Sequence, residues 1–153
     1  MKRRKIRSLS VSEIGMGCMG FSHGYGQVPG AGYAEEAIRE AFGYGCNFFD
    51  TAEGYGKELY YPGHNEEIVG RAVRGFRNEV VIATKLHIRP EAVEDCGSVY
   101  AAVRRHLERS LKNLQIDYVD LYYLHRINME VDNLEVAHAM GRLIPVSYTH
   151  LTL

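Results

Sequence analysis

Three polar residues, Asp50, Lys85 and His125, each end a short apolar run of the sequence. The runs are NFFD, VVIATK and VDLYYLH, and they lack helical periodicity, as buried parallel strands do. The intervals between the three residues each suit one strand, loop, helix and loop. We therefore predict that the three side chains hold equivalent positions in successive βα units. They should gather at the carboxyl edge of one parallel sheet, where α/β folds place their chemistry.

Tyr55 adds a phenol to this acid, amine and imidazole, because it lies in the loop that follows Asp50. Such a set suits proton donation to a carbonyl oxygen while a hydride reaches the carbonyl carbon. A phenol is a weak acid near neutral pH, and a nearby ammonium favours its ionised form. We predict that Lys85 supplies this ammonium and that Asp50 holds it in place. His125 should orient the carbonyl and donate a hydrogen bond to the developing oxyanion.

The hydrophobic pattern predicts the strands and helices that would position these residues. Strands are expected at residues 14–21, 47–50, 80–85 and 119–125. Helices are expected at residues 33–44, after an N-cap at Asn65, after a start at Ser98, and at residues 134–144. Alternation of short buried strands with amphipathic helices is typical of βα units, and the chain holds half of an eightfold βα pattern.

Composition and charge bound the class of protein. The chain of 153 residues has 46% hydrophobic and 24% charged residues, which is typical of one globular domain. A formal net charge of -1 provides no field for a nucleic-acid partner. The basic residues near the N-terminus fit a solvated strand or hairpin: Lys2, Arg3, Arg4, Lys5 and Arg7. No apolar stretch follows them as in a signal peptide, and no run reaches the roughly 20 apolar residues of a membrane span.

The chain has three cysteines, Cys18, Cys46 and Cys96, without paired spacing. This pattern indicates neither a disulfide framework nor a metal site. A reducing cytoplasm is therefore the expected location.

One glycine motif suggests a different fold. Gly15, Gly17 and Gly20 match G-x-G-x-x-G, the pattern of a Rossmann dinucleotide site. That site needs a helix to open directly after the glycines, so that its N-terminus meets the pyrophosphate. Glycine-rich loop sequence follows instead, and the next strand-end acid, Asp50, is further away than the usual spacing of about twenty residues. We therefore interpret these glycines as sites of close backbone approach at a strand end.

The last residues, 145–153, differ in character from the rest. Residues 146–153, VSYTHLTL, read back as GTC TCT TAT ACA CAT CTG ACG CTG, and Pro145 fits the preceding bases as CCT. This nucleotide sequence resembles a transposon-type sequencing-library adapter. We therefore expect the native sequence to run to about Ile144, and we interpret residues 145–153 as an artefact tail outside the domain of residues 1–144.

Across residues 1–144 the sequence resembles the aldo/keto reductase superfamily. The matching motifs are IGMGCMGF, NFFDTAEGYG, HNEEIVGRAVRGF, VVIATK, DLYYLHR and HAMGRLI. The resemblance implies an α/β fold, the N-terminal half of a (β/α)8 TIM barrel with about four βα units. It also implies an NADP-dependent oxidoreductase that reduces a small-molecule aldehyde or ketone to an alcohol. Its catalytic tetrad would be Asp50, Tyr55, Lys85 and His125, with Tyr55 as the proton donor.

The same resemblance implies that the cofactor NADP(H) passes Gly17, Cys18, Met19 and Asp50. Cys18 replaces the usual hydroxyl residue and Met19 the usual aromatic residue, so the contact is expected to depend on the backbone. A whole barrel needs about 250 residues. The later strands of the family carry the residue that stacks on the nicotinamide, the carboxamide contacts and the basic residues that bind the 2′-phosphate. We therefore expect reductase activity of the intact gene product and none of this chain alone.

Two other functions remain open from the sequence. One is a family relative that senses nucleotides or regulates a channel without catalysis, although an intact tetrad argues against it. The other is a short protein in which the half-barrel self-associates for a structural role.

Overall fold

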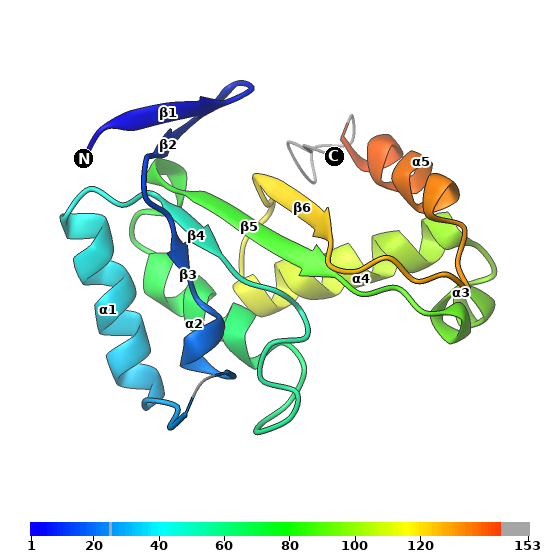
Figure 1. The fold of residues 1–153 in the computed structure, drawn as a ribbon, viewed down its shortest axis with the longest axis horizontal. Coiled ribbons are helices and arrows are strands. Elements are labelled where there is room, and N and C mark those ends of the chain that lie inside the picture. The colour runs from blue at the N-terminus through cyan, green and yellow to red at the C-terminus, as the bar shows by residue number, and fades with distance from the viewer. Residues whose placement is uncertain (25, 145–153) are drawn as a thin grey trace.

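In the computed structural model, which describes residues 1–24 and 26–144, four parallel strands form one sheet in the order β3-β4-β5-β6 (Figure 1). These strands are β3 (Met16–Gly17), β4 (Phe48–Asp50), β5 (Val81–Leu86) and β6 (Leu121–Leu124). An antiparallel hairpin of β1 (Arg3–Ile6) and β2 (Leu9–Ser12) precedes them. The hairpin matches the expectation for the basic N-terminal segment, since β1 is largely exposed.

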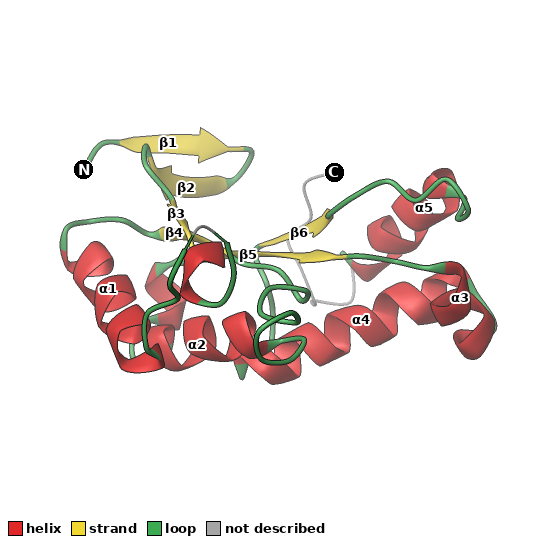
Figure 2. Ribbon diagram, turned by 60° about the horizontal axis from the view of Figure 1, so that its bottom comes forward, coloured by secondary structure: helices red, strands yellow, loops and turns green. Residues whose placement is uncertain are grey.

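Helices connect successive parallel strands, and one more helix follows the last strand. They are α1 (Ala31–Gly43), α2 (His64–Val73), α3 (Pro90–Cys96), α4 (Val99–Leu114) and α5 (Asn133–Leu143), with two short 3-10 helices, η1 (Met19–Phe21) and η2 (Arg77–Glu79). Figure 2 shows α1, α2 and α4 along one face of the sheet and the hairpin on the opposite side. The predicted alternation of strands and helices is confirmed. No helix among the described residues has the length and apolar character needed to cross a membrane.

Alternate residues of each strand point to opposite faces of the sheet. On the outer face, which the helices cover, Phe49, Ile82 and Tyr122 are fully buried in the large hydrophobic core. On the inner face, Ala83 and Leu121 belong instead to a small cluster with residues of the hairpin. The two faces of one sheet therefore have different partners, a helix layer outside and a hairpin inside.

Helices α2 and α4 pack in direct backbone contact at Gly70. A Cβ atom at this position would lie 2.0 Å from the carbonyl oxygen of Leu114, so only glycine allows this approach. The predicted apolar stripes of both helices are confirmed as buried: Ile68, Val69, Ala72 and Val73 on α2, and Val99, Val103, Leu107, Leu111 and Leu114 on α4. Phe76, expected at the end of the α2 stripe, is only partly buried.

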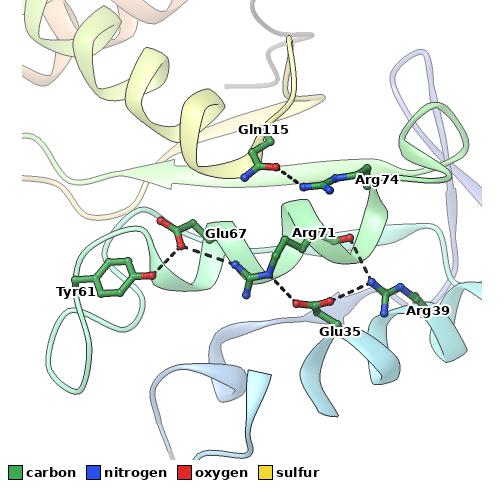
Figure 3. Close-up of polar contacts among 7 residues, drawn as sticks. All are labelled: Glu35, Arg39, Tyr61, Glu67, Arg71, Arg74 and Gln115. Atoms are coloured by element: carbon green, nitrogen blue, oxygen red, sulfur yellow. Dashed lines mark hydrogen bonds and ion pairs between the residues drawn. The ribbon is translucent and has the colours of Figure 1, made fainter. Parts of the chain in front are cut away.

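A polar network on the outer surface joins α1 to α2 (Figure 3). Arg71 donates from Nε to Glu35 Oε1 over 2.7 Å, and its Nη1 lies 3.8 Å from Glu67 Oε2. Arg39 donates to the other oxygen of Glu35 over 3.1 Å. Tyr61, in the loop before α2, donates its hydroxyl hydrogen to Glu67 over 2.7 Å. Exposed pairs of this kind add little stability, but this set connects the loop between β4 and α2 to the helix layer.

The first predicted strand is much shorter than expected. Residues 14–21 form only the two-residue strand β3 and then turn into η1. The Cys18 N–H still donates to the Asp50 carbonyl oxygen over 2.8 Å, whereas the Cys18 carbonyl accepts from Phe21 N over 3.0 Å. Pairing with β4 therefore ends where this local turn takes over the backbone hydrogen bonds.

The predicted N-cap at Asn65 is wrong. Helix α2 begins at His64, and Gly63 is the N-cap residue with a φ of 92°. Asn65 lies inside the first turn with a fully buried side chain. Its short polar side chain is typical of helix caps, but here it binds neighbouring loops instead.

Two helix starts show how local sequence acts. Ser98 is confirmed as the N-cap of α4, since its hydroxyl accepts from the N–H of Ala101 over 3.2 Å. Helix α3 was not predicted, although Pro90 at its start is a favoured first-turn residue.

The three cysteines are free thiols. The predicted adapter-derived tail, residues 145–153, lies outside the described residues.

Candidate active site

Strands β4 and β5 and the end of β6 bring Asp50, Lys85 and His125 to the inner side of the sheet. The register pairs Asp50 with Ala83 and Lys85 with Tyr123. Lys85 follows Ala83 by two residues, and His125 follows Tyr123 by two. The three positions are therefore staggered rather than equivalent, as expected where strands tilt in a curled sheet. A step of two residues keeps all three side chains on the same face.

The ammonium group of Lys85 is the centre of the site. Its Nζ donates to Asp50 Oδ1, to the Thr51 carbonyl oxygen over 2.7 Å, and to Tyr55 Oη over 3.3 Å. The Lys85 side chain is only 15% exposed. Since an ammonium has three hydrogens to donate, these contacts use all of them and hold the group beside the Tyr55 phenol.

His125 also lies against Tyr55. The two ring centroids are 5.5 Å apart, and the rings meet edge to face at 83°. Burial lowers the pKa of His125 below its usual value, and the positive charges of Lys85 and Arg126 lower it further, while Asp50 opposes them. The imidazole is therefore neutral near pH 7, so it can donate an N–H to an oxygen without adding a second positive charge.

A buried hydrogen-bond network, which the sequence did not predict, connects the segments next to the site. Asn65 donates from Nδ2 to the Cys18 carbonyl oxygen (2.8 Å) and to Ser22 Oγ (2.9 Å). Its Oδ1 accepts from the Thr51 hydroxyl over 2.7 Å. Ser22 Oγ in turn lies 2.8 Å from His64 Nδ1. The network joins the segment after β3, the loop after β4 and the start of α2. The only sequence signal was a polar residue before an apolar stripe, which also marks a helix cap.

Glu53 is a buried residue that the sequence did not single out. Its Oε1 accepts from the backbone N–H of His87 over 2.7 Å. Its Oε2 lies 2.8 Å from His106 Nδ1 and accepts from Arg109 over 2.9 Å. The Glu53 N–H donates to the Lys85 carbonyl oxygen over 3.2 Å. Glu53 therefore joins the loop that carries Tyr55 to the end of β5 and to α4.

The residues predicted to contact the cofactor lie together beside Asp50. Gly17 is exposed, and a Cβ at this position would have no atom within 4 Å, so the end of β3 is open. Met19 is partly buried. The Cys18 side chain is 0% exposed, and burial raises its pKa to about 12, so the thiol is neutral and inside the core. Both backbone polar groups of Cys18 already have partners within the protein. A contact to the cofactor through Cys18 stays a prediction that depends on its backbone.

Two cavities meet at the site. The larger, about 810 Å³, is lined by Asp50, Lys85 and His125 together with Gly17 and residues of the hairpin. The smaller, about 290 Å³, is lined by Tyr55 and His125 together with Met19, Lys57 and Arg126. His125 borders both cavities, and the phenol and the imidazole both line the smaller one.

Comparisons with known proteins identify the family. The sequence profile of the Aldo/keto reductase family matches residues 13–145. Probable aldo-keto reductase 1 of Glycine max is 34% identical over 142 residues, which cover 90% of this chain and 39% of that protein. Aldo-keto reductase yakc [NADP(+)] of Schizosaccharomyces pombe is 35% identical over 147 residues, which cover 92% of this chain and 41% of that protein. The chain belongs to the aldo/keto reductase family, whose members are oxidoreductases.

Solved structures agree with this result. The holo form of aldo-keto reductase AKR11C1 from Bacillus halodurans superposes with a TM-score of 0.79 at 30% identity, covering 99% of this chain and 50% of that one. The thermostable aldo-keto reductase Tm1743, solved with the inhibitor epalrestat, gives a TM-score of 0.78 at 28% identity, covering 99% of this chain and 53% of that one. The predicted fold, part of an aldo-keto reductase TIM barrel, is confirmed. The chain spans about half the length of these structures.

Proposed function

We propose that the full-length protein carrying this chain is an NADP-dependent oxidoreductase that reduces an aldehyde or ketone to an alcohol. The observation that carries the proposal is the position of the Lys85 ammonium, which donates to Asp50, to the Thr51 carbonyl and to the Tyr55 phenol at once. The NADP(+)-linked relative in Schizosaccharomyces pombe supports the choice of cofactor. Small carbonyl compounds are the expected substrates, as for the family.

Each residue of the tetrad has a separate role in this reaction. Tyr55 gives its proton to the carbonyl oxygen, and Lys85 stabilises the phenolate that remains, because the two groups are hydrogen-bonded. Asp50 keeps the ammonium in position. His125, neutral and edge-on to the phenol, orients the carbonyl and donates a hydrogen bond to its oxygen.

The described residues fit one side of a nicotinamide cofactor. Gly17 leaves the end of β3 open next to Asp50 and the larger cavity, so a flat ring can approach the backbone there. Gly17, Met19 and Asp50 would hold this end, with Cys18 contributing backbone only. When bound, NADPH supplies the hydride. The remaining contacts would come from sequence beyond the half-barrel.

The test uses the full-length protein with NADPH and a simple aldehyde. Tyr55→Phe should lower turnover by roughly 10² to 10⁴, the range for loss of a general acid, while NADPH binding measured by fluorescence stays nearly unchanged. Lys85→Met should have a similar effect, and Asp50→Asn should also reduce turnover because the ammonium loses its partner. Near-normal turnover of Tyr55→Phe would exclude Tyr55 as the proton donor.

The same assay separates this function from the two alternatives. A nucleotide-sensing or channel-regulating relative would bind NADPH without reducing the aldehyde. A short structural protein would do neither. The tetrad contacts favour catalysis, since a purely structural protein has no need of a phenol in contact with both an ammonium and an imidazole.

We also propose that the domain consists of residues 1–144 and that residues 145–153 derive from an adapter sequence. The family match, which runs over residues 13–145, supports this boundary. Resequencing of the genomic locus across codon 145 should replace VSYTHLTL by sequence that continues the barrel. Recovery of the same eight residues from genomic DNA would contradict the proposal. The cytoplasmic location expected from the cysteines stays a prediction.

A further inference from the structure

The smaller cavity combines the reactive end of the site with two cationic side chains, Lys57 and Arg126. Tyr55 and His125 line this space of about 290 Å³, and Lys57, His87 and Arg126 line it as well. Arg126 directly follows His125, and His87 follows the last residue of β5. Arg126 and His87 therefore stand at the carboxyl ends of the strands that carry His125 and Lys85, and Lys57 lies in the loop after β4.

The Arg126 guanidinium has no hydrogen-bonding partner within the part of the chain that the structure describes. Its side chain is exposed and forms no hydrogen bond or ion pair with another described residue. The one carboxylate that lines the cavity, Glu58, is already engaged, since it lies 3.1 Å from His23 Nδ1 and 3.7 Å from Lys57 Nζ. The cavity thus has an unused planar donor group that suits a bidentate carboxylate.

His87 lies close to these positive charges. Burial lowers the pKa of this imidazole, and the charges of Arg89, Lys57 and Arg126 lower it further, against Glu53. Its backbone is held by the buried Glu53 carboxylate, which accepts the His87 N–H over 2.7 Å. His87 is therefore a neutral hydrogen-bonding group with an anchored backbone, near the cations Arg89, Lys57 and Arg126.

We propose that the preferred substrate is an anionic carbonyl compound, whose carboxylate binds Arg126, with Lys57 and His87 alongside, while its carbonyl group lies at Tyr55 and His125. The proposal rests on the reductase function above and adds the class of substrate. A carboxylate fits because the cavity places a fork of guanidinium donors beside the site of reduction. A neutral carbonyl compound would leave this guanidinium unpaired.

The experiment compares two aldehydes of nearly the same shape, 4-formylbenzoate and its methyl ester, with the full-length protein and NADPH. The wild-type kcat/KM should be at least about tenfold higher for the anion, the usual size of one charge-assisted contact. Arg126→Gln should lower kcat/KM for the anion by about 10-fold to 100-fold, mainly through KM, and leave the ester unchanged. Arg126→Lys should restore part of the loss, because it keeps the charge but not the fork.

Arg74→Gln is the matched control, since Arg74 is an exposed arginine that donates to Gln115 over 2.6 Å, away from the cavity. It should leave the ratio of the two aldehydes unchanged. Equal use of the two aldehydes by the wild type, or unchanged selectivity in Arg126→Gln, would overturn the proposal and leave the reductase function intact. Reduction of neither aldehyde would instead contradict the reductase function itself, and the substrate class with it.

Discussion

The two faces of the parallel sheet use the same strands for different purposes. On the outer face, Phe49, Ile82 and Tyr122 are fully buried under the helices. On the inner face, the described apolar residues pack near the hairpin, and Asp50 and Lys85 occupy the far end. Since side chains alternate along a strand, successive residues of β4 and β5 pack in the core on one face and point toward the candidate site on the other. The outer face therefore completes its packing within the described residues, whereas the inner face stays open to a partner.

The largest predicted effect comes from this open inner face. Within the described residues, β3 and β6 each pair on one side only, and the inner cavity of about 810 Å³ borders the sheet. Unpaired strand edges and uncovered apolar surface recruit other chains. We expect expressed residues 1–153 to aggregate or dimerise and to show no NADPH-dependent reductase activity. Gel filtration and a fluorescence titration with NADPH measure both properties. A cooperatively melting monomer that binds NADPH tightly would show that the inner face needs no partner.

The packing on the outer face should weaken when the close contact between α2 and α4 is disturbed. In the full-length protein, Gly70→Ala should lower the free energy of unfolding by about 3 kcal/mol, because the new Cβ meets the Leu114 carbonyl oxygen at 2.0 Å. Gly43→Ala is the control, since Gly43 ends α1 and a Cβ there meets no atom within 4 Å. It should be neutral or stabilise by up to about 1 kcal/mol through helix propensity. Urea denaturation compares the two, and equal effects would refute close α2–α4 packing.

Two buried glutamates, Glu53 and Glu66, have partners of different charge and opposite pKa shifts. Burial alone raises the pKa of Glu53, but His106, the His87 N–H and Arg109 together hold it below the usual value. Burial raises the pKa of Glu66, because its partners Thr84 and Asn113 are neutral and compensate only in part. Both carboxyls are almost inaccessible, at 6% and 0% exposed, so the charge of the partners decides the direction of each shift.

Opposite pKa shifts predict opposite pH dependence of stability. The lowered pKa of Glu53 means that the unfolded state binds more protons, so its stabilisation is present above the unfolded pKa and is lost as pH falls. The raised pKa of Glu66 means that the folded state binds the proton more tightly, so stability falls as pH rises above the unfolded value. Denaturation from about pH 2 to about pH 8 should therefore show a weaker acid loss in Glu53→Gln and a weaker decline toward neutral pH in Glu66→Gln. Identical profiles of the two variants would contradict the assignment.

The smallest predicted effect contrasts two tyrosines. Tyr55, which lines the smaller cavity, has a hydroxyl that accepts from Lys85, whereas the Tyr122 hydroxyl on the outer face is buried without a hydrogen-bond partner among the described residues. Tyr122→Phe should leave turnover unchanged and stabilise the fold by about 1 kcal/mol or less, because an unpaired polar group leaves the core. Thermal unfolding of the full-length variant measures this. A clear loss of stability would show that the hydroxyl has a partner in the complete barrel.

Much of the fold could be predicted from the sequence, because hydrophobic periodicity and caps are local signals. The strands before Asp50, Lys85 and His125 and the stripes of α2 and α4 are where the pattern placed them. The residue types and their spacing also indicated the candidate tetrad. In barrels of this kind, catalytic residues can be expected at the carboxyl ends of neighbouring strands.

Other features depended on contacts between distant segments. The stagger of the three strand-end residues follows from sheet register, which no single strand encodes. Asn65 carries the local signal of a helix cap, yet burial between the segment after β3 and the loop after β4 gives it three partners there. Gly70 is one glycine among sixteen until α4 packs against it. Periodicity along the chain determined which residues face the sheet or the helices. Only the tertiary structure decided which of them meet, because hydrogen bonds and close packing act between atoms that the sequence separates.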